Sequence, residues 1–285
     1  MKNCIKVELW KAVHNSYFNL ALITGLLLAL YNIFTTSQTV PDLLERSVNA
    51  MSEGLPIYNF KGASLFIWWI ADNLANFGSV YFFQIWPLIA AIPFAWSYSQ
   101  ESKSGSIVQY VVRMNRKQYF AAKYIAVFVT GGLVVAIPVF ADLMINALIC
   151  PAENLMFYNQ LTGIYEASFL SKLFFMHPFL HALIWCGIDF LLGGSASVLC
   201  FLLGGKPKYI FIASVFPFAF LYTISVIGTL VMSVTGSYLQ SSILNMAQHS
   251  SAGIAPGWLL FTVIALQMLL PGMVGFFRMV KNDIL

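Results

Sequence analysis

The stretch Ser97–Lys123, SYSQESKSGSIVQYVVRMNRKQYFAAK, lies between two long apolar segments and carries five of the chain's fifteen Lys and Arg residues. The chain around it has 285 residues, of which 59% are hydrophobic and only 9% are charged. A soluble domain of this size is about one quarter charged, so a chain this poor in charge cannot cover a water-facing surface. The sequence therefore predicts an all-α protein that spans a membrane several times.

Six apolar segments reach the roughly 20 residues that a helix needs to cross a bilayer. They are residues 17–36, 79–98, 122–150, 177–203, 209–234 and 257–277. No segment between them is long enough for a soluble domain, so we expect one transmembrane domain over residues 1–285. The apolar run Leu20–Leu30 follows N-terminal lysines, as in a secretory signal, but no small-x-small cleavage site comes after it. We interpret it as an uncleaved first span.

The distribution of basic residues predicts the orientation of these spans. With the N-terminus inside, twelve Lys and Arg residues fall on inner segments and three, Arg46, Lys61 and Lys172, on outer segments. Such an excess follows the positive-inside rule. Six spans then place both termini in the cytoplasm, and Ser97–Lys123 becomes the inner loop between spans two and three.

Two outer segments allow more than one interpretation. The apolar run Ser64–Ile70 is too short to span, and polar residues follow it. Residues 63–78 are therefore either an interfacial helix, with Trp68 and Trp69 at headgroup depth, or an outward extension of span two. Residues 235–256 are rich in Ser, Gly, Asn and Gln, which suits a re-entrant hairpin or an ordinary loop.

The usual sequence signs of a catalytic or cofactor site are missing. No G-x-x-x-x-G-K-[ST] phosphate-binding loop is present, and Gly204–Lys208 lacks its spacing, so we interpret it as a tight inner turn. The four cysteines are dispersed without a CxxC pair, which argues against a disulfide framework and a cysteine zinc site. We expect no catalytic residue, cofactor or metal in this chain.

Three ionisable residues are candidates for a substrate path: Asp142, Asp189 and His181. Acids inside a membrane are costly and commonly face a bundle interior or a water-filled path. Asp189 is either a substrate- or proton-contacting group or an acid hydrogen-bonded to a neighbouring helix, and for Asp142 the second interpretation is favoured. His177, His181 and Asp142 could instead form the two-His-one-carboxylate site of a membrane metalloenzyme. Interfacial histidines beside Pro178 are the plainer explanation.

The run Gly193-Gly194-Ser195-Ala196-Ser197 in the fourth span lets helices approach closely. We expect it to pack against another helix of the same chain, and a seam between two chains is the alternative.

Helical spacing within Ser97–Lys123 predicts a short amphipathic helix at the inner membrane surface. Its apolar side is formed by Ile107, Val111 and Met114. Glu101 near its start and Arg113 near its end both suit the helix dipole. Asn115 suits a break before the next span. A positive-inside loop that binds anionic lipid is the other interpretation of the same residues.

The order of these residues resembles the membrane subunits of type-2 ABC transporters. In that family an acidic residue and a Gly-Thr or Gly-Ser pair follow span two, and a basic pair precedes span three. Here Glu101, Gly105-Ser106, Arg116 and Lys123 stand in those places. Residues 7–15, VELWKAVHN, are similar to the family's amphipathic elbow helix. Ser106 replaces the commoner threonine, and Met114-Asn115 stands where the family often has a proline-containing turn.

The resemblance implies the permease subunit of an ATP-driven exporter in a bacterial cell membrane, with a coupling helix within residues 101–116. The residues expected to couple to the ATPase are Glu101, Gly105, Ser106, Arg113, Arg116 and Lys123. The expected partners are two ATP-binding subunits, which would hold ATP and Mg²⁺, a second permease copy, identical or related, and membrane lipid, but no nucleic acid.

The composition of the bundle suggests a class of cargo, and a second transporter class remains as an alternative. An aromatic-rich, weakly charged bundle suits a hydrophobic or amphipathic cargo, such as a peptide, drug or lipid. A self-sufficient secondary carrier is the alternative transporter class, and it predicts more intramembrane ionisable groups and symmetry-related repeats.

Overall fold

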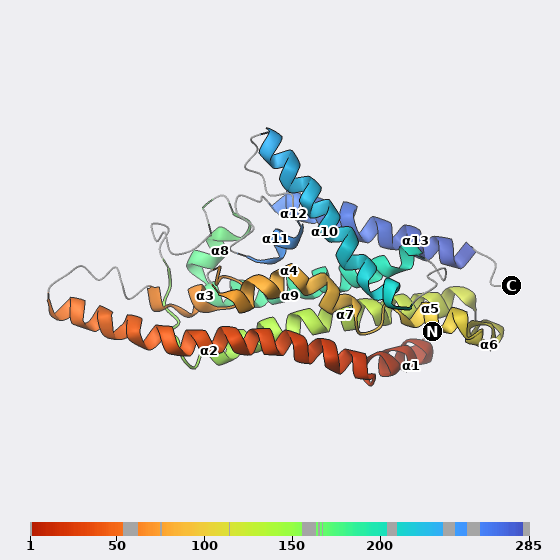
Figure 1. Ribbon diagram of the computed structural model, residues 1–285, viewed down its shortest axis with the longest axis horizontal. Helices are drawn as coiled ribbons and strands as arrows, with labels where there is room; N and C mark the ends of the chain where they lie inside the picture. The colour runs from red at the N-terminus through yellow and green to blue at the C-terminus, as the bar shows by residue number, and fades with distance from the viewer. Residues whose placement is uncertain are drawn as a thin grey trace.

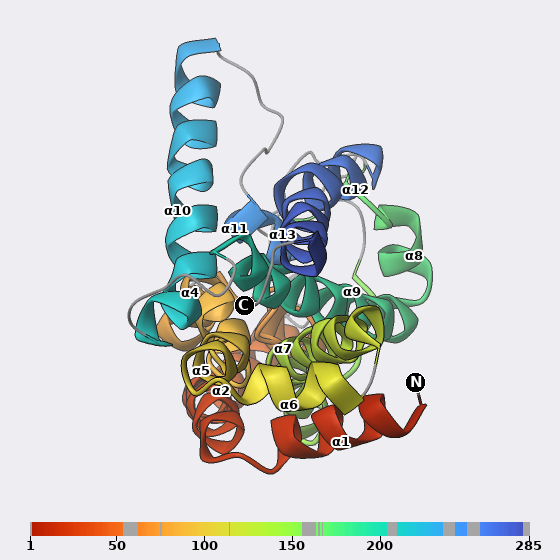
Figure 2. The same cartoon turned by 90° about the vertical axis from the view of Figure 1, so that its right-hand side faces the viewer.

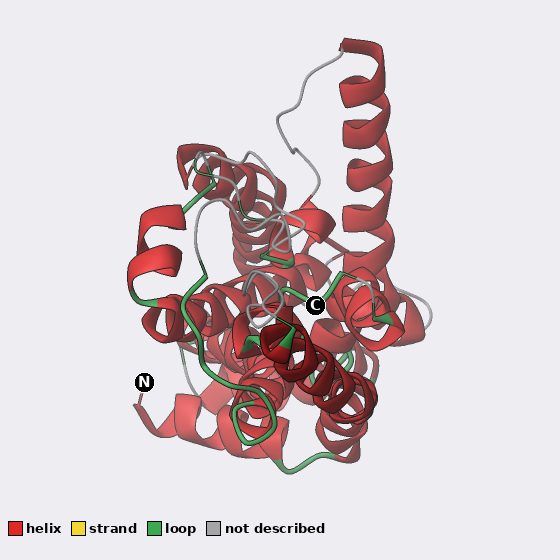
Figure 3. Cartoon of the chain, turned by 90° about the vertical axis from the view of Figure 1, so that its left-hand side faces the viewer, coloured by secondary structure: helices red, strands yellow, loops and turns green. Residues whose placement is uncertain are grey.

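The computed structural model describes residues 2–53, 62–74, 76–113, 115–155, 164, 166, 168–203, 210–235, 243–249 and 257–281. Within these residues all regular structure is helical and no strand occurs (Figures 1 and 3). The elements are α1 (Lys2–Val13), α2 (Ser16–Ser52), α3 (Leu65–Trp68), α4 (Phe77–Ala91), α5 (Ser97–Lys103), α6 (Ser106–Arg113), α7 (Arg116–Asn146), α8 (Ser171–Met176), α9 (Pro178–Ser197), the 3₁₀ helix η2 (Val198–Leu203), α10 (Ile210–Thr235), α11 (Ile243–Ala247), α12 (Gly257–Ile264), the π turn η4 (Ala265–Leu269) and α13 (Leu270–Lys281).

Four described helices are long and apolar enough to cross a membrane, rather than the six spans expected. They are Ser16–Arg46, Arg116–Asn146, Pro178–Leu203 and Phe211–Thr235. They match the expected spans one, three, four and five, and they indicate a multi-pass membrane protein.

Of the two remaining predicted spans, one is an interrupted helix and the other contains a π turn. The helix expected at residues 79–98 ends at Ala91, because Pro93 has no backbone N–H to continue the hydrogen-bond ladder, and α5 begins only at Ser97. In the region expected at residues 257–277, α12, the π turn at Ala265–Leu269 and α13 follow one another without a gap.

The centre of the molecule is the close crossing of α7 and α9. A Cβ added to Gly193 would lie 2.7 Å from the carbonyl oxygen of Gly131, and one added to Gly194 would lie 2.7 Å from that of Phe128. Since only glycine fits such contacts, the prediction that the small-residue run packs within the chain is confirmed. Gly131 and Gly132 of α7, which the sequence analysis did not single out, form the other side of this contact.

Helices α1, α5 and α6 gather at one end of the molecule, which we call the inner end, and both the N-terminus and the end of α13 lie there (Figures 1 and 2). This placement agrees with the prediction that both termini lie on one side of the membrane. The opposite end, the outer end, holds α3, α8 and the last turns of α2 (Figure 1).

The described residues between 63 and 78 form neither one interfacial helix nor an outward extension of span two. This region contains the four-residue helix α3, a turn, and Asn76, whose side chain accepts a hydrogen bond from Gly78 N and caps α4. Trp69 is buried and donates from Nε1 to the Val139 carbonyl at 3.0 Å. Trp69 therefore packs inside the protein against α7 and does not face the surroundings.

The described part of residues 235–256 is the last residue of α10, Thr235, then α11 and the two residues after it. Ile243, Met246 and His249 are buried, so this segment packs into the protein and is not an exposed loop. Its flanking residues, like the inner turn Gly204–Lys208, lie outside the described residues.

Candidate functional site

Lys123, two turns into α7, is a fully buried lysine at the inner end. Its Nζ lies 2.8 Å from Oε2 of Glu8 on α1 and 2.8 Å from Oε1 of Glu101 on α5. A buried charge is tolerated only when it is paired and hydrogen-bonded. The lysine therefore holds α1 and α5 against α7, and of the residues proposed for coupling, Glu101 and Lys123 contact each other directly.

Further polar contacts extend this arrangement to α6. Lys11 Nζ lies 2.9 Å from Glu8 Oε1 and donates to the hydroxyl of Tyr110 at 3.0 Å. The Tyr119 hydroxyl donates to Glu101, and the ring of Tyr119 stacks on Tyr110 with centroids 5.7 Å apart. We call this set the inner ion-pair cluster; its members are Glu8, Lys11, Glu101, Tyr110, Tyr119 and Lys123.

The charges of the inner ion-pair cluster are balanced. Burial by itself raises the pKa of Glu8, but Lys123 and Lys11 outweigh burial and hold that pKa below its ordinary value. Burial likewise lowers the pKa of Lys11, but its hydrogen bonds to Tyr110 and Glu8 outweigh that effect and raise the pKa. Two carboxylates and two ammonium groups therefore meet with no net charge, which reduces the cost of burying them.

A tight turn connects helix α6 to α5. Gly105 has φ +69°, the left-handed region that favours glycine, and it separates α5 from α6. Ile107 is buried, as its place on the predicted apolar side requires, whereas Val108 is exposed and Val112 is 81% exposed. Helix α6 therefore has a second apolar side, and this side is exposed. The side chain of Arg113, and Met114, lie outside the described residues.

The remaining coupling candidates lie at the edges of α6. Ser106 Oγ lies 2.8 Å from Ser104 Oγ beside the Gly105 turn. Asn115 accepts from Lys117 N at 3.0 Å and caps α7, which confirms the predicted break before Arg116. Arg116 donates from Nη2 to the Met279 carbonyl at 2.9 Å, so its guanidinium contacts the last turn of α13.

Asp142 belongs to a separate buried polar cluster toward the outer end. Its Oδ1 accepts from Asn32 Nδ2 at 2.9 Å, and its Oδ2 accepts from Ile70 N at 2.8 Å and Asn146 Nδ2 at 2.9 Å. Asn32 in turn accepts from Asn73 at 2.9 Å. The favoured interpretation of Asp142, an acid hydrogen-bonded to its neighbours, is confirmed.

Asp189 and His181 are both fully buried in α9. Neither carboxylate oxygen of Asp189 has a hydrogen-bond partner among the described residues, so no Ser, Thr or Asn of a described helix satisfies it. His181 packs against Trp185 and against His249, whose ring centroid is 4.5 Å away. His249 could not be predicted as a neighbour of His181, because a single histidine in a polar outer segment carries no spacing signal.

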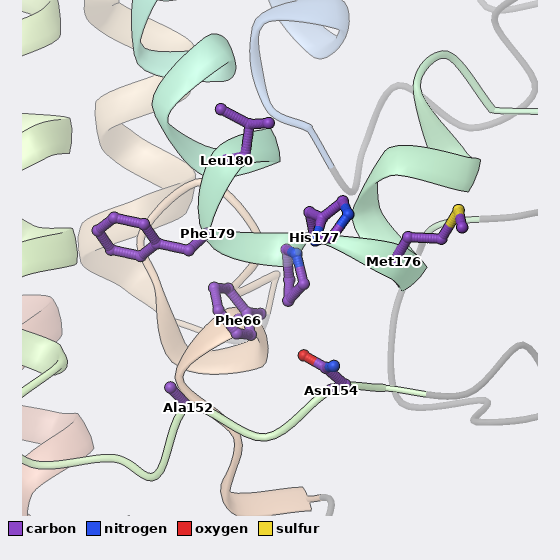
Figure 4. A pocket seen from close by; sticks show the side chains of 8 residues that line it. Phe66, Ala152, Asn154, Met176, His177, Phe179 and Leu180 are labelled. Carbon is purple, nitrogen blue, oxygen red and sulfur yellow. The ribbon is translucent and has the colours of Figure 1, made fainter.

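The residues of the metalloenzyme hypothesis are not brought together. His177 lines an outer cavity of about 520 Å³ together with Phe66 and Asn154 (Figure 4), whereas His181 is buried against His249 and Asp142 is surrounded by amides. No group of three or more His, Cys, Asp or Glu side chains in the described part of the chain is placed to hold a metal ion. The outer cavity is lined by mostly apolar side chains and no carboxylate.

No protein-family model matches the chain, and neither a curated protein nor a solved structure matches it. The four long apolar helices and the wholly helical secondary structure of the described residues therefore characterise the chain by themselves. They indicate a multi-pass membrane protein.

Proposed function

We propose that this chain is the permease subunit of an ATP-driven exporter in a bacterial cell membrane, energised by a separate ATP-binding subunit. The observation that supports this most is the inner ion-pair cluster. It fixes α1 and the α5–α6 pair to α7 and leaves the apolar side of α6, with Val108 and Val112, exposed at the inner end. A loop that only sets the orientation of the chain in the membrane needs basic charge. It does not need two carboxylates that pair with one buried lysine.

In this proposal the exposed side of α6 docks on the ATP-binding subunit. A push on α6 reaches α1 through Tyr110 and Lys11, and it reaches α7 through Glu101 and Lys123. Because α7 and α9 touch backbone to backbone at their glycines, a tilt of α7 moves α9 with it. The force would thus change the packing of the helices around the path.

The same proposal accounts for the two predicted spans that are not among the four long helices. The α4–α5 and α12–α13 segments would be the second and sixth spans, the one broken near Pro93 and the other containing the π turn. Two such permeases, identical or related, would pair above two ATP-binding subunits that hold ATP and Mg²⁺, and this chain would catalyse no reaction itself. A hydrophobic or amphipathic cargo suits the apolar outer cavity, and Asp189, which has no hydrogen-bond partner among the described residues, would lie on its path.

The test changes the exposed side of α6 and spares the buried cluster. Reversing the charge of Glu101 would disrupt the packing of α5 on Lys123, so loss of partner binding would be ambiguous. Val112→Asp alters a side chain that is 81% exposed, and Val234→Asp on α10, 86% exposed, is the matched control at the far end of the chain's fifth predicted span.

The tagged full chain is purified from its native membrane, and ATP-binding subunits are quantified by mass spectrometry together with the ATPase activity of the eluate. We expect a stoichiometric ATP-binding chain with the wild type and with Val234→Asp. We expect at least a tenfold loss with Val112→Asp. A wild-type chain that carries no ATP-binding subunit, or a Val112→Asp chain that retains it, would contradict the proposal.

A further inference from the structure

Two histidines that the proposed function does not use lie against each other toward the outer end. His181 belongs to α9 and His249 follows α11; the side chains are 0% and 4% exposed, and their ring centroids are 4.5 Å apart. Aromatic side chains surround them: Trp185 and Phe174 contact both rings, and Trp69 lies beside His249.

The polar atoms of this pair are unsatisfied. No ring nitrogen of His181 or His249 has a hydrogen-bond partner among the described residues. The titratable groups that face His249 in this part of the chain are His181, from α9, and Asp72, from the turn after α3. The His249 Nδ1 to Asp72 Oδ1 distance is 3.7 Å, which is too long for a hydrogen bond.

Burial of His249 depends on the position of the segment that carries it. Residues 243–249, which we call the α11 segment, are held by two hydrogen bonds: Trp185 Nε1 donates to the Ala247 carbonyl at 3.1 Å, and Gln248 Nε2 donates to Ser79 Oγ at 2.9 Å. His249 can therefore reach water only when the α11 segment leaves its place against α4 and α9.

We propose that packing of the α11 segment is linked to the protonation of His249, so that the segment stays packed while His249 is neutral and is released in acid. A proton on packed His249 would create a charge among aromatic rings and beside a second histidine, with the Asp72 carboxylate 3.7 Å away, beyond hydrogen-bond distance. The same proton on released His249 would be hydrated. The proposal is independent of whether the chain transports anything.

The sign of the linkage follows from the two environments. Burial, together with the neighbouring His181, holds the pKa of packed His249 well below its ordinary value. Released His249 takes up a proton near pH ~6.5. Since the released state binds more protons, packing is fully favoured above about pH 6.5, and the packing equilibrium falls by up to about tenfold for each pH unit below it.

Hydrogen exchange of the purified full chain in lipid nanodiscs tests this linkage between pH 5 and pH 8, with rates corrected for the intrinsic effect of pH. Peptides that cover the α11 segment should lose protection below about pH 6.5, by up to about tenfold per unit, while peptides of α7 remain protected. In His249→Gln the protection should not depend on pH. His177→Gln, which changes the histidine at the outer cavity, should behave as the wild type does.

Three results would overturn the proposal. Protection that is constant with pH in the wild type would exclude the linkage, and pH-dependent protection in His249→Gln would assign it to another group. Protection that rises in acid would mean that a His249–Asp72 ion pair holds the segment. The Asp72→Asn variant distinguishes release in acid from an ion pair that holds the segment, and it leaves His249 unchanged. Acid-induced release should persist in this variant, and loss of that release would also count against the proposal.

Discussion

At the scale of single residues, Lys123 shows how a charge inside an apolar protein is made tolerable. The ammonium group lies between the carboxylates of Glu8 and Glu101, and its Nζ is 4.8 Å from the centroid of the Phe94 ring. Each partner comes from a different helix, so the lysine specifies which helices meet at the inner end. Removal of the lysine alone would take away the cation that both carboxylates contact, and Glu8 would keep only Lys11.

We therefore expect Lys123→Met to destabilise the protein by about 3–5 kcal/mol, because breaking a buried ion pair leaves an uncompensated charge. Lys117→Met, on the exposed side of the same helix, is the control and should change the stability by less than about 0.5 kcal/mol. Denaturant unfolding of the detergent-solubilised chain measures both. Equal stability of the two variants would show that Lys123 is not paired in the folded protein.

At the scale of elements, the contact between α7 and α9 depends on glycines whose backbones touch. Two positions on α9 can be compared directly. A Cβ at Gly193 would meet the Gly131 carbonyl at 2.7 Å, whereas a Cβ at Gly187 would meet nothing within 4 Å. The same substitution on the same helix therefore has opposite steric consequences.

Gly193→Ala should destabilise the protein by about 1–3 kcal/mol, since the methyl group forces two backbones apart. Gly187→Ala should leave the protein as stable or stabilise it by up to about 1 kcal/mol, because alanine favours the helix and restricts the unfolded chain. Thermal unfolding in one detergent compares them. If both variants unfold at the same temperature, the close α7–α9 contact does not exist in solution.

At the scale of the whole molecule, the inner and outer ends have different chemistry. Both described chain ends lie at the inner end (Figure 1). The inner end also carries the ion-pair cluster, and the outer end carries an apolar cavity and buried histidines. This division matches the positive-inside distribution of Lys and Arg and predicts a single orientation in the membrane.

Labelling of cysteines with a membrane-impermeant maleimide tests that orientation. Cys4, on α1, should react only when the cytoplasmic side is accessible, and a cysteine introduced at Met176, which is 68% exposed on α8, should react from the outside of intact cells. Cys150, Cys186 and Cys200 are buried and give a low background. Reaction of Cys4 from outside would reverse the predicted orientation.

Much of this architecture could be predicted from local sequence. Apolar length located the four long helices, and the Asn115 cap could be read from residue type, because these features depend on neighbours within a few positions. The expectation that Glu101 lies near the start of the amphipathic helix is wrong, because the turn at Gly105 separates α6 from α5, which carries Glu101. The prediction failed where a segment is apolar and long enough for a span but does not form a regular α-helix throughout. The helix breaks near Pro93 in one such segment, and it takes π geometry at Ala265–Leu269 in the other.

The sequence by itself determined the class of the protein, its helical structure and the end that holds its basic charge, since composition, apolar length and charge placement act without tertiary contacts. Only the tertiary structure decided that Lys123 pairs with both Glu8 and Glu101, that Asp142 is satisfied by amides and that His181 meets His249. Helical spacing tells which side of a helix is apolar, but not which distant helix covers it. These partners lie far apart in the chain, and their pairing is set by how whole helices pack, as at the glycine contact of α7 and α9.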